Sequence, residues 1–286
     1  MRIAYQGEPG AFSEAASRQI DATAELTPCK AFEDVFEAVE GGAVDCGVLP
    51  IENSIGGSIH RNFDLLLQHD LPIVGEVEQP VVHHLLALPG VTLDRIRRVY
   101  SHPQALAQCD RFLRTLSGVD IIATYDTAGS AKMIADGRLE DAAAVASARA
   151  AEVFGLATIK SSIQDFERNT TRFLVVGRQP LPSAVADKTS IVFTLANEPG
   201  VLFKALSVFA LRGINMTKLE SRPVPERKWE YLFYADLAAA QDDVTCSRAL
   251  AHLAEFALML RVLGSYPSCK PATANQVAAR PSEIHV

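Results

Sequence analysis

Residues 167–178 read Glu-Arg-Asn-Thr-Thr-Arg-Phe-Leu-Val-Val-Gly-Arg and join a polar cluster to an apolar run. Positions 169–172 place amide, hydroxyl and guanidinium groups next to one another, and the apolar run 173–176 predicts a buried strand directly after them. Such a cluster on a rigid element suits the binding and protonation of an anion. A strand with a polar lead-in is an equally good interpretation of these residues alone, so the choice depends on the rest of the chain.

Upstream of this segment, the sequence repeats a strand, a polar turn and a helix. Strands are expected at 2–5, 46–49, 99–100, 121–125 and 142–146, and each leads into a helix. This alternation predicts an α/β fold with a largely parallel sheet, whose ligands bind beyond the carboxyl ends of the strands. Gly, Ser, Thr, Asn and Gln concentrate at those ends, where helix N-termini favour a small anion. Many such residues only cap helices, which is our interpretation of Ser147.

Composition excludes several classes of function. The chain has 286 residues, of which 48% are hydrophobic and 21% charged, and its net charge is −7, so we expect about two globular domains and no nucleic-acid partner. No signal-peptide or membrane-spanning pattern is found, which predicts a cytoplasmic protein without a membrane partner. Five cysteines lack any Cys-x-x-Cys spacing, and His83 and His84 would point to opposite faces of a strand, so no metal site is expected. The dinucleotide fingerprint is missing, and we predict no cofactor.

The C-terminal third predicts a second domain. Residues 179–187 contain two prolines and lack periodicity, so they are interpreted as a linker between a domain over 1–178 and one over 188–267. The second domain alternates strands and helices in the order βαββαβ, which is typical of a ferredoxin-like fold. Residues 268–286 are polar and aperiodic and are predicted to be disordered.

The motifs, taken in order, resemble those of monofunctional prephenate dehydratases that carry a C-terminal ACT regulatory domain. The resemblance covers almost the whole chain. It is carried by Tyr-Gln-Gly-Glu-Pro-Gly-Ala-Phe-Ser from Tyr5, Leu-Pro-Ile-Glu-Asn-Ser from Leu49, Ser-His-Pro-Gln from Ser101, Asn-Thr-Thr-Arg-Phe from Asn169, and Glu-Pro-Gly-Val-Leu from Glu198. It implies a catalytic domain with two lobes, like a type 2 periplasmic binding protein, followed by an ACT domain.

The resemblance also implies site residues. We expect Thr171 to hydrogen-bond the leaving hydroxyl within a network, and the expected catalytic residues are Thr171, Asn53, Glu52 and Gln108. The expected substrate-binding residues are Ser101, Thr127, Ser130, Arg172 and Asn169. Arg172 has a second interpretation, as a structural ion-pair partner. The expected effector-binding residues are Pro199, Gly200, Val201, Leu202, Asn215, Glu220 and Ser221.

The implied activity is that of a carbon–oxygen lyase, which converts prephenate to phenylpyruvate, CO2 and water in phenylalanine biosynthesis. L-phenylalanine is expected to inhibit it through the ACT domains of a homodimer or homotetramer. Two alternatives stay open: an arogenate dehydratase, and a non-catalytic two-lobed sensor of small anions. The sequence departs from the family pattern at Ile55 and at 165–168, where an aspartate pair is frequent in the family. A threonine is a poor acid, and Glu52 and His102 are the expected sources of its proton.

Overall fold

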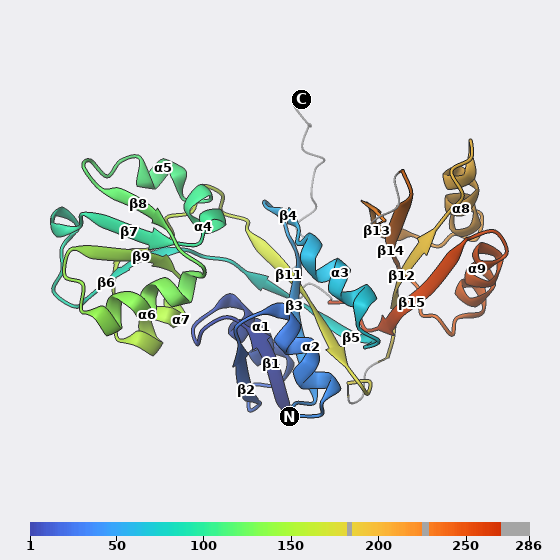
Figure 1. Ribbon diagram of the computed structural model, residues 1–286, viewed down its shortest axis with the longest axis horizontal. Helices are drawn as coiled ribbons and strands as arrows, with labels where there is room; N and C mark the ends of the chain where they lie inside the picture. Colours follow the sequence, from blue (N-terminus) through green and yellow to red (C-terminus); the bar gives the residue numbers. More distant parts are fainter. Residues whose placement is uncertain (182–184, 225–228, 270–286) are drawn as a thin grey trace, which may run out of the picture.

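The structure is a computed structural model that describes residues 1–181, 185–224 and 229–269. Two α/β lobes and a smaller α/β domain lie in a row (Figure 1). Most of the predicted disordered tail, residues 270–286, lies outside the described residues, as do positions 182–184 of the predicted linker.

The first lobe is built on a sheet in the order β2-β1-β3-β11-β5. Its strands are β1 (Arg2–Gln6), β2 (Glu25–Cys29), β3 (Cys46–Asn53), β5 (Ile73–Pro80) and β11 (Thr170–Gly177), with the short β4 (Gly57–Ser58) paired to β3. Its helices are α1 (Phe12–Ile20), α2 (Phe32–Glu40) and α3 (His60–Gln68). Helix α2 forms because its apolar residues recur at helical spacing, and its buried side chains are Val35, Phe36 and Val39.

The second lobe has a sheet in the order β10-β6-β9-β7-β8. Its strands are β6 (His84–Ala87), β7 (Arg98–Ser101), β8 (Asp120–Ala123), β9 (Ala142–Ala146) and β10 (Ala157–Lys160). Its helices are the 3-10 turn η1 (Leu93–Arg95), α4 (Pro103–Ala107), α5 (Asp110–Leu113), α6 (Thr127–Gly137) and α7 (Ala148–Phe154). Strand β9 is buried along its whole length because helices pack over it.

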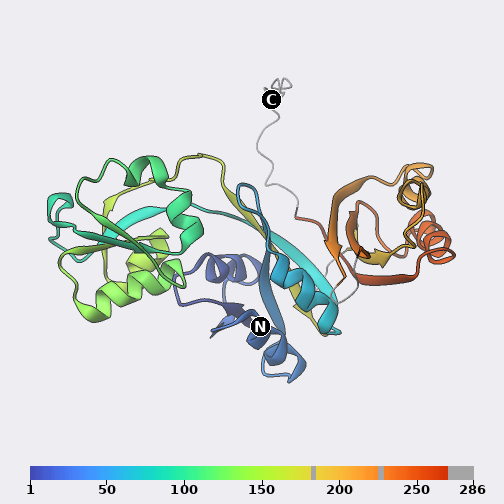
Figure 2. The ribbon, with the colours of Figure 1, turned by 45° about the horizontal axis from the view of Figure 1, so that its top comes forward.

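The chain passes between the lobes twice, once between β5 and β6 and once between β10 and β11 (Figure 2). We call residues 81–83 and 161–169 the crossing segments. The strands that flank them run antiparallel to their neighbours, so that β11 is antiparallel to both β3 and β5, and β6 to both β9 and β10. The predicted largely parallel sheet is therefore wrong: each lobe has a mixed sheet, because the chain must leave one lobe and return.

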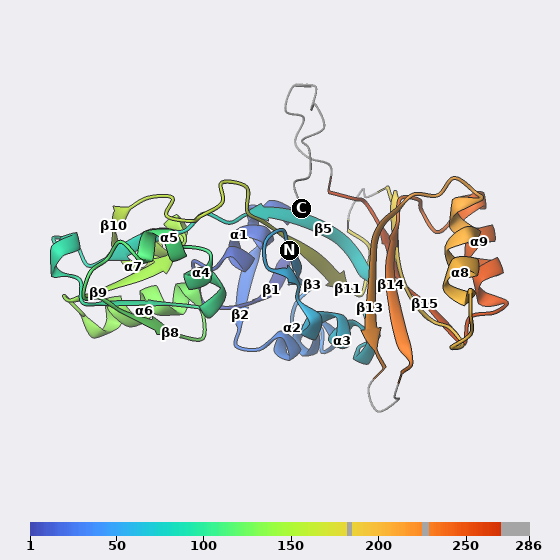
Figure 3. The same ribbon diagram turned by 90° about the horizontal axis from the view of Figure 1, so that it is seen from above.

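The third domain has the strand order β13-β14-β12-β15 and two helices on one face of its sheet (Figure 3). Its elements are β12 (Lys188–Thr194), α8 (Val201–Ala210), β13 (Met216–Pro223), β14 (Tyr231–Leu237), α9 (Val244–Ala254) and β15 (Met259–Tyr266), in the predicted βαββαβ order.

The other face of this sheet packs against the first lobe. Tyr234 and Tyr266 belong to the same buried cluster as Leu174 of β11. At Gly264 the backbones of β15 and β5 approach so closely that a Cβ there would lie 2.1 Å from the carbonyl oxygen of Ile73. A glycine is therefore required where the two sheets meet.

Candidate active site

A cavity of about 360 Å³ lies between the two lobes. Its walls come from the ends of β1 and β3, the starts of α1, α2, α4, α6 and β11, and the first crossing segment. The lining includes four of the predicted site residues, Asn53, Gln108, Thr127 and Thr171. The position agrees with the rule that ligands of α/β sheets bind beyond the ends of the strands.

Two neighbouring strands place the polar side chains of the first lobe in this cavity. Thr171 on β11 pairs with Asn53 on β3, and both side chains are more than nine-tenths buried. The loop that follows β3 closes on the second lobe, where a Cβ at Gly56 would overlap the Gln104 side chain. A larger residue at position 56 would therefore have to displace the end of the Gln104 side chain.

The direction of the hydrogen bonds around Asn53 follows from backbone groups that can only donate. Its Oδ1 accepts from the N–H groups of Ile55 at 3.1 Å and Gly56 at 2.8 Å. The carboxamide nitrogen is therefore on the other side and donates to Thr171 Oγ1 at 2.9 Å. Because Thr171 accepts this bond, its own hydroxyl proton is available to a partner in the cavity.

Asp126 joins the two lobes at the edge of the cavity. Its carboxylate caps α6 by accepting from the N–H groups of Ala128 and Gly129 at 2.7 and 3.2 Å, and it also accepts from the N–H of Glu8 at 3.1 Å. Lys132 of α6 donates to the Glu8 side chain at 3.0 Å. These contacts hold the start of α6 against the turn that follows β1.

The described lining contains no Lys or Arg, and Asp126 is the only carboxylate in it. The start of α1 offers N–H groups to an anion, because its N-cap, Ala11, provides no capping side chain. The first turn also contains the buried carboxylate of Glu14, which accepts from the N–H of Gly10, so an anion there is bound by N–H donors rather than by net positive charge. Ala11, Phe12 and Ser13 all line the cavity. This end of α1 is thus suited to a carboxylate.

Two histidines in the lining are neutral at neutral pH. Burial lowers the pKa of both His83 and His102, since desolvation disfavours the charged imidazolium. His102 also caps α4, where its Nδ1 accepts from the N–H of Gln104 at 3.2 Å.

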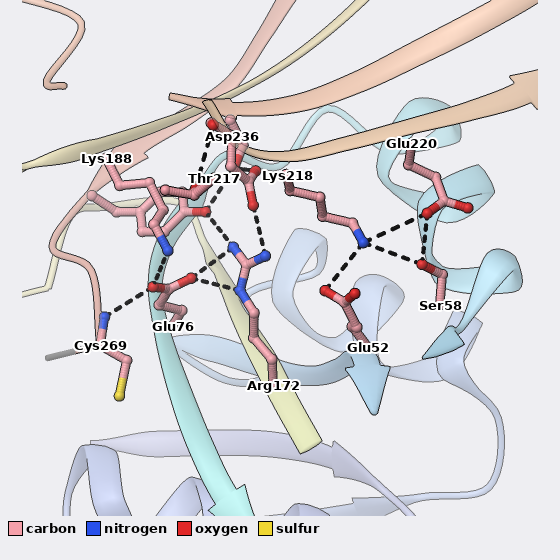
Figure 4. Close-up of polar contacts among 12 residues, drawn as sticks. Glu52, Ser58, Glu76, Arg172, Lys188, Thr217, Lys218, Glu220, Asp236 and Cys269 are labelled. Atoms are coloured by element: carbon pink, nitrogen blue, oxygen red, sulfur yellow. Dashed lines mark hydrogen bonds and ion pairs between the residues drawn. The ribbon is translucent and has the colours of Figure 1, made fainter. Parts of the chain in front are cut away.

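The structure does not bring Arg172 to the cavity, which corrects its predicted role in substrate binding. Thr171 and Arg172 are adjacent on β11 and point to opposite faces of the sheet. The Arg172 guanidinium contacts Glu76 of β5 at 2.6 Å and Asp236 of β14 at 2.6 Å (Figure 4). Burial alone would lower the pKa of Arg172, but these carboxylates raise it overall, so the charge is retained. Of its two predicted interpretations, the structural ion pair is the one found.

The predicted catalytic residue Glu52 is on the same outer face. It precedes Asn53 on β3, so its side chain points away from the cavity and forms an ion pair with Lys218 of β13 at 3.1 Å (Figure 4). A carboxylate in this position cannot supply a proton to Thr171, which corrects that expectation as well.

The remaining predicted substrate-binding residues are divided. Thr127 lines the cavity at the start of α6. Asn169 does not line the cavity; it is buried, and its side-chain oxygen accepts from Asn53 at 2.7 Å. Ser101 and Ser130 do not line it: Ser101 donates to the carbonyl of Val145 at 2.6 Å within the sheet, and Ser130 donates to the carbonyl of Asp126 at 2.8 Å. Each hydroxyl is used inside the second lobe, which corrects these two assignments.

The predicted effector residues are separated within this one chain. Gly200, Val201 and Leu202 line a hollow between the start of α8 and β14, whereas Pro199, Asn215, Glu220 and Ser221 do not. Glu220 is turned toward the first lobe, where Ser58 donates to it at 2.8 Å. Inhibition was expected through the ACT domains of a homodimer or homotetramer, and the described chain by itself does not bring these residues together into one site.

Several lining residues were not predicted. His83 lies in the first crossing segment, and Phe12 packs edge-on against its ring with the ring centres 5.5 Å apart. The tandem histidines at 83 and 84 are the signal for this position in the sequence, and by themselves they indicate only that a metal site is not expected there. Within residues 1–181, 185–224 and 229–269, no three His, Cys, Asp or Glu side chains are grouped to hold a metal ion. None of the helices in these ranges is both long and apolar enough to span a bilayer.

Two known protein families match two separate parts of this chain. The family described as prephenate dehydratase matches residues 3–181, and the ACT domain matches residues 189–245. A relative from Arabidopsis thaliana, "Arogenate dehydratase/prephenate dehydratase 2, chloroplastic", is 54% identical over 93% of this chain and 73% of its own length.

Two solved structures share the fold along almost the whole chain. Prephenate dehydratase from Arthrobacter aurescens in complex with L-Phe is 32% identical, with a TM-score of 0.86 over 98% of this chain and 93% of the other. A protein described as GqqA, a novel type of quorum quenching acylase, is 38% identical, with a TM-score of 0.84 over 94% of this chain and 98% of the other.

These relatives overturn the prediction of a cytoplasmic protein. The Arabidopsis thaliana relative is named as chloroplastic, and so are further relatives at 48 to 50% identity. The prediction depended on the absence of a targeting pattern in this sequence, which is a weak basis.

Proposed function

This chain belongs to the prephenate dehydratase family and carries an ACT domain, and from that premise we propose that it converts prephenate to phenylpyruvate, CO2 and water. Family membership makes it a carbon–oxygen lyase and sets aside the predicted non-catalytic sensor. The substrate has two carboxylates and a ring hydroxyl. Loss of the ring carboxylate and the hydroxyl makes the ring aromatic, which drives the reaction.

The contact in which Asn53 donates to Thr171, and which leaves the threonine proton available, is the observation that carries this proposal. When the bond between the ring and its carboxylate breaks, its electron pair enters the ring and the hydroxyl leaves as hydroxide. A hydrogen bond from Thr171 stabilises the charge that develops on the departing oxygen. Asn53 holds the Thr171 oxygen at 2.9 Å, so the donor is already oriented before the substrate arrives. Overall the reaction takes up one proton, because a dianion becomes a monoanion.

Substrate carboxylates are bound by neutral donors in this proposal. The uncapped start of α1, with Ser13 beside it, is suited to one carboxylate. The described lining contains no Lys or Arg that could form an ion pair with the carboxylate lost as CO2. This favours decarboxylation, because a tightly paired carboxylate is stabilised against the loss of its charge.

Substitution of Thr171 tests the proposal. We expect Thr171→Ala to lower kcat by about 10²- to 10⁴-fold and Thr171→Ser, which keeps the hydroxyl, to retain most of it. Phenylpyruvate formation is followed by its absorbance in base, with circular dichroism to confirm that both variants are folded. Near-normal turnover by Thr171→Ala would refute the role of this hydroxyl.

Arogenate is the second candidate substrate, because a relative that is 54% identical is named for both arogenate and prephenate. Arogenate carries an amino group where prephenate has a keto group, and its product is phenylalanine. Assays of both substrates with one enzyme preparation, compared by kcat/KM, separate the two functions.

We further propose that L-phenylalanine inhibits the enzyme through the ACT domains of a dimer or tetramer. The support is the L-Phe complex of the Arthrobacter aurescens relative and the hollow at the start of α8. Added phenylalanine should lower activity and raise the Tm, and sedimentation should show an oligomer. An unchanged rate and an unchanged Tm together would contradict this regulation.

A further inference from the structure

We propose that His83 is a positioning residue for the dehydration. Its imidazole, protonated at Nε2, holds the Gln108 side chain against Asn53. This inference rests on the proposed function of the cavity. His83 lies in the crossing segment 81–83 and is 2% exposed. None of the family motifs quoted above contains it.

The tautomer follows from the hydrogen bonds already fixed around Asn53. Because Asn53 Oδ1 is an acceptor, the group of Gln108 that faces it at 3.2 Å must be the amide nitrogen. The Gln108 oxygen is then on the opposite side, where it lies 3.0 Å from His83 Nε2. Two acceptors would repel each other at this distance, so His83 Nε2 must carry a hydrogen.

The same logic extends to the second donor on Gln108. Asn169 Nδ2 donates to Gln108 Oε1 at 2.9 Å, and Asn169 Oδ1 accepts from Asn53 at 2.7 Å. Every bond in this group is thus consistent with the single direction set by the backbone N–H groups of Ile55 and Gly56. His83 and Asn169, one from each crossing segment, together fix the Gln108 oxygen.

The backbone of His83 is held as firmly as its ring. Its N–H donates to Gln164 Oε1 at 3.1 Å, and its carbonyl accepts from the N–H of Ile163 at 2.9 Å. These partners belong to the other crossing segment. His83 therefore links both crossing segments to Gln108, which lies at the C-terminal end of α4.

An apolar side chain would fill this position more simply if packing were its only purpose. Burial lowers the pKa of His83, so the ring is neutral and has one donor and one acceptor. The acceptor, Nδ1, is buried and has no hydrogen-bond partner among the described residues. A buried unpartnered nitrogen is unfavourable, so the contact with Gln108 is the feature that favours histidine here.

Four substitutions test the proposal. The amide nitrogen of His83→Gln can occupy the place of Nε2, whereas that of His83→Asn reaches only the place of Nδ1, and His83→Leu has no donor. We expect His83→Asn and His83→Leu to lower kcat by about tenfold with little change in KM, and His83→Gln to regain most of it. His84→Leu is the matched control, because the side-chain contact of His84 is with the N–H of Ser162 at 3.4 Å and not with Gln108, and it should stay within about twofold of the unaltered protein.

A double substitution separates positioning from a general structural effect. Since His83 acts through Gln108, His83→Leu should cause little further loss in a Gln108→Ala background. Equal losses in both backgrounds would overturn the proposal, as would equal kcat values for His83→Gln and His83→Asn. If His83→Leu does not fold, the Gln and Asn pair decides.

The tautomer can be measured without any activity. Long-range nitrogen–proton NMR spectra of the full chain should show His83 protonated at Nε2 and bare at Nδ1, and the opposite tautomer would refute the proposal. An unaltered protein that converts neither prephenate nor arogenate would refute the proposed function, and the NMR result would still decide the His83–Gln108 contact.

Discussion

At the scale of single residues, the chemistry of this site depends on which atoms of ordinary amides face which neighbours. Thr171 has an unremarkable hydroxyl, and it becomes a directed donor only because Asn53 gives it a hydrogen bond. Asn53 in turn is oriented by two backbone N–H groups. A substitution that keeps the size and shape of a side chain but replaces its hydrogen-bond donor by an acceptor is therefore the sharpest test of this arrangement.

Asn53→Asp is such a change. An aspartate has no N–H to give to Thr171, so the threonine would turn its proton toward the carboxylate and withdraw it from the substrate. We expect kcat to fall by about 10²- to 10³-fold, the size of effect seen when one donor to a developing charge is lost. Steady-state kinetics on prephenate measure this, and a kcat within about threefold of the unaltered enzyme would contradict the assigned bond direction.

Stability should depend on pH through His83. Its ordinary pKa is 6.5, and burial lowers the value in the folded protein. Above pH 6.5 the contribution to stability is complete; as pH falls toward the folded-state pKa, the unfolded chain takes up the proton first and the free energy of unfolding decreases. Urea unfolding at about pH 7.5 and about pH 5.5 should show a smaller decrease for His83→Gln than for the unaltered protein, since His84 and His102 remain in both. Equal decreases would contradict this.

At the scale of elements, the side chains of β3 and β11 have different roles on the two faces of the sheet. Asn53 and Thr171 face the cavity, while their chain neighbours Glu52 and Arg172 face the ACT domain. Strand alternation could be predicted from the sequence, and so could the helices with regular apolar spacing. Which face would meet the cavity could not be predicted, because that depends on how β3 and β11 pair and on what packs behind them.

Glu52 and Arg172 provide a test of the outer face. Glu52→Gln should leave kcat within about threefold of the unaltered enzyme, because its side chain points away from the cavity. Arg172→Met should destabilise the protein by about 3–5 kcal/mol, because Asp236 would remain buried without its ion-pair partner and Glu76 would keep only Lys188. Urea unfolding curves give the loss of stability. As a control, Arg114→Met, which removes the exposed ion pair with Asp110, should lower the free energy of unfolding by under about 1 kcal/mol.

At the scale of the whole molecule, the ACT sheet is attached to the catalytic part by packing as well as by charge. The order of domains could be predicted from the sequence, since the motifs and the change of composition near residue 179 mark it. The contact between Gly264 and β5 could not, because it joins residues almost two hundred positions apart and no local pattern indicates it.

Gly264→Ala should weaken this attachment. The added methyl group would overlap the backbone of Ile73, which cannot move as a side chain can, so β15 must shift away from β5. We expect a lower Tm and a weaker response of activity to phenylalanine, with kcat in the absence of phenylalanine retained. Gly137→Ala, at a position without a positive φ where the added Cβ meets only the end of the Leu139 side chain, controls for the loss of glycine alone. A phenylalanine response equal to that of the control would show that this contact does not transmit the signal.

The crossing segments have a mechanical consequence. A rotation displaces each atom in proportion to its distance from the axis. If the two lobes rotate about the crossing segments, atoms near those segments move least. His83 and Asn169 lie in the crossing segments and Thr171 directly follows the second one, whereas Glu8 and Lys132 form an ion pair between the lobes outside those segments. Swinging the lobes apart at this ion pair would admit a substrate through a wide arc and leave the hydroxyl almost stationary, so the catalytic machinery need not be reassembled at each turnover.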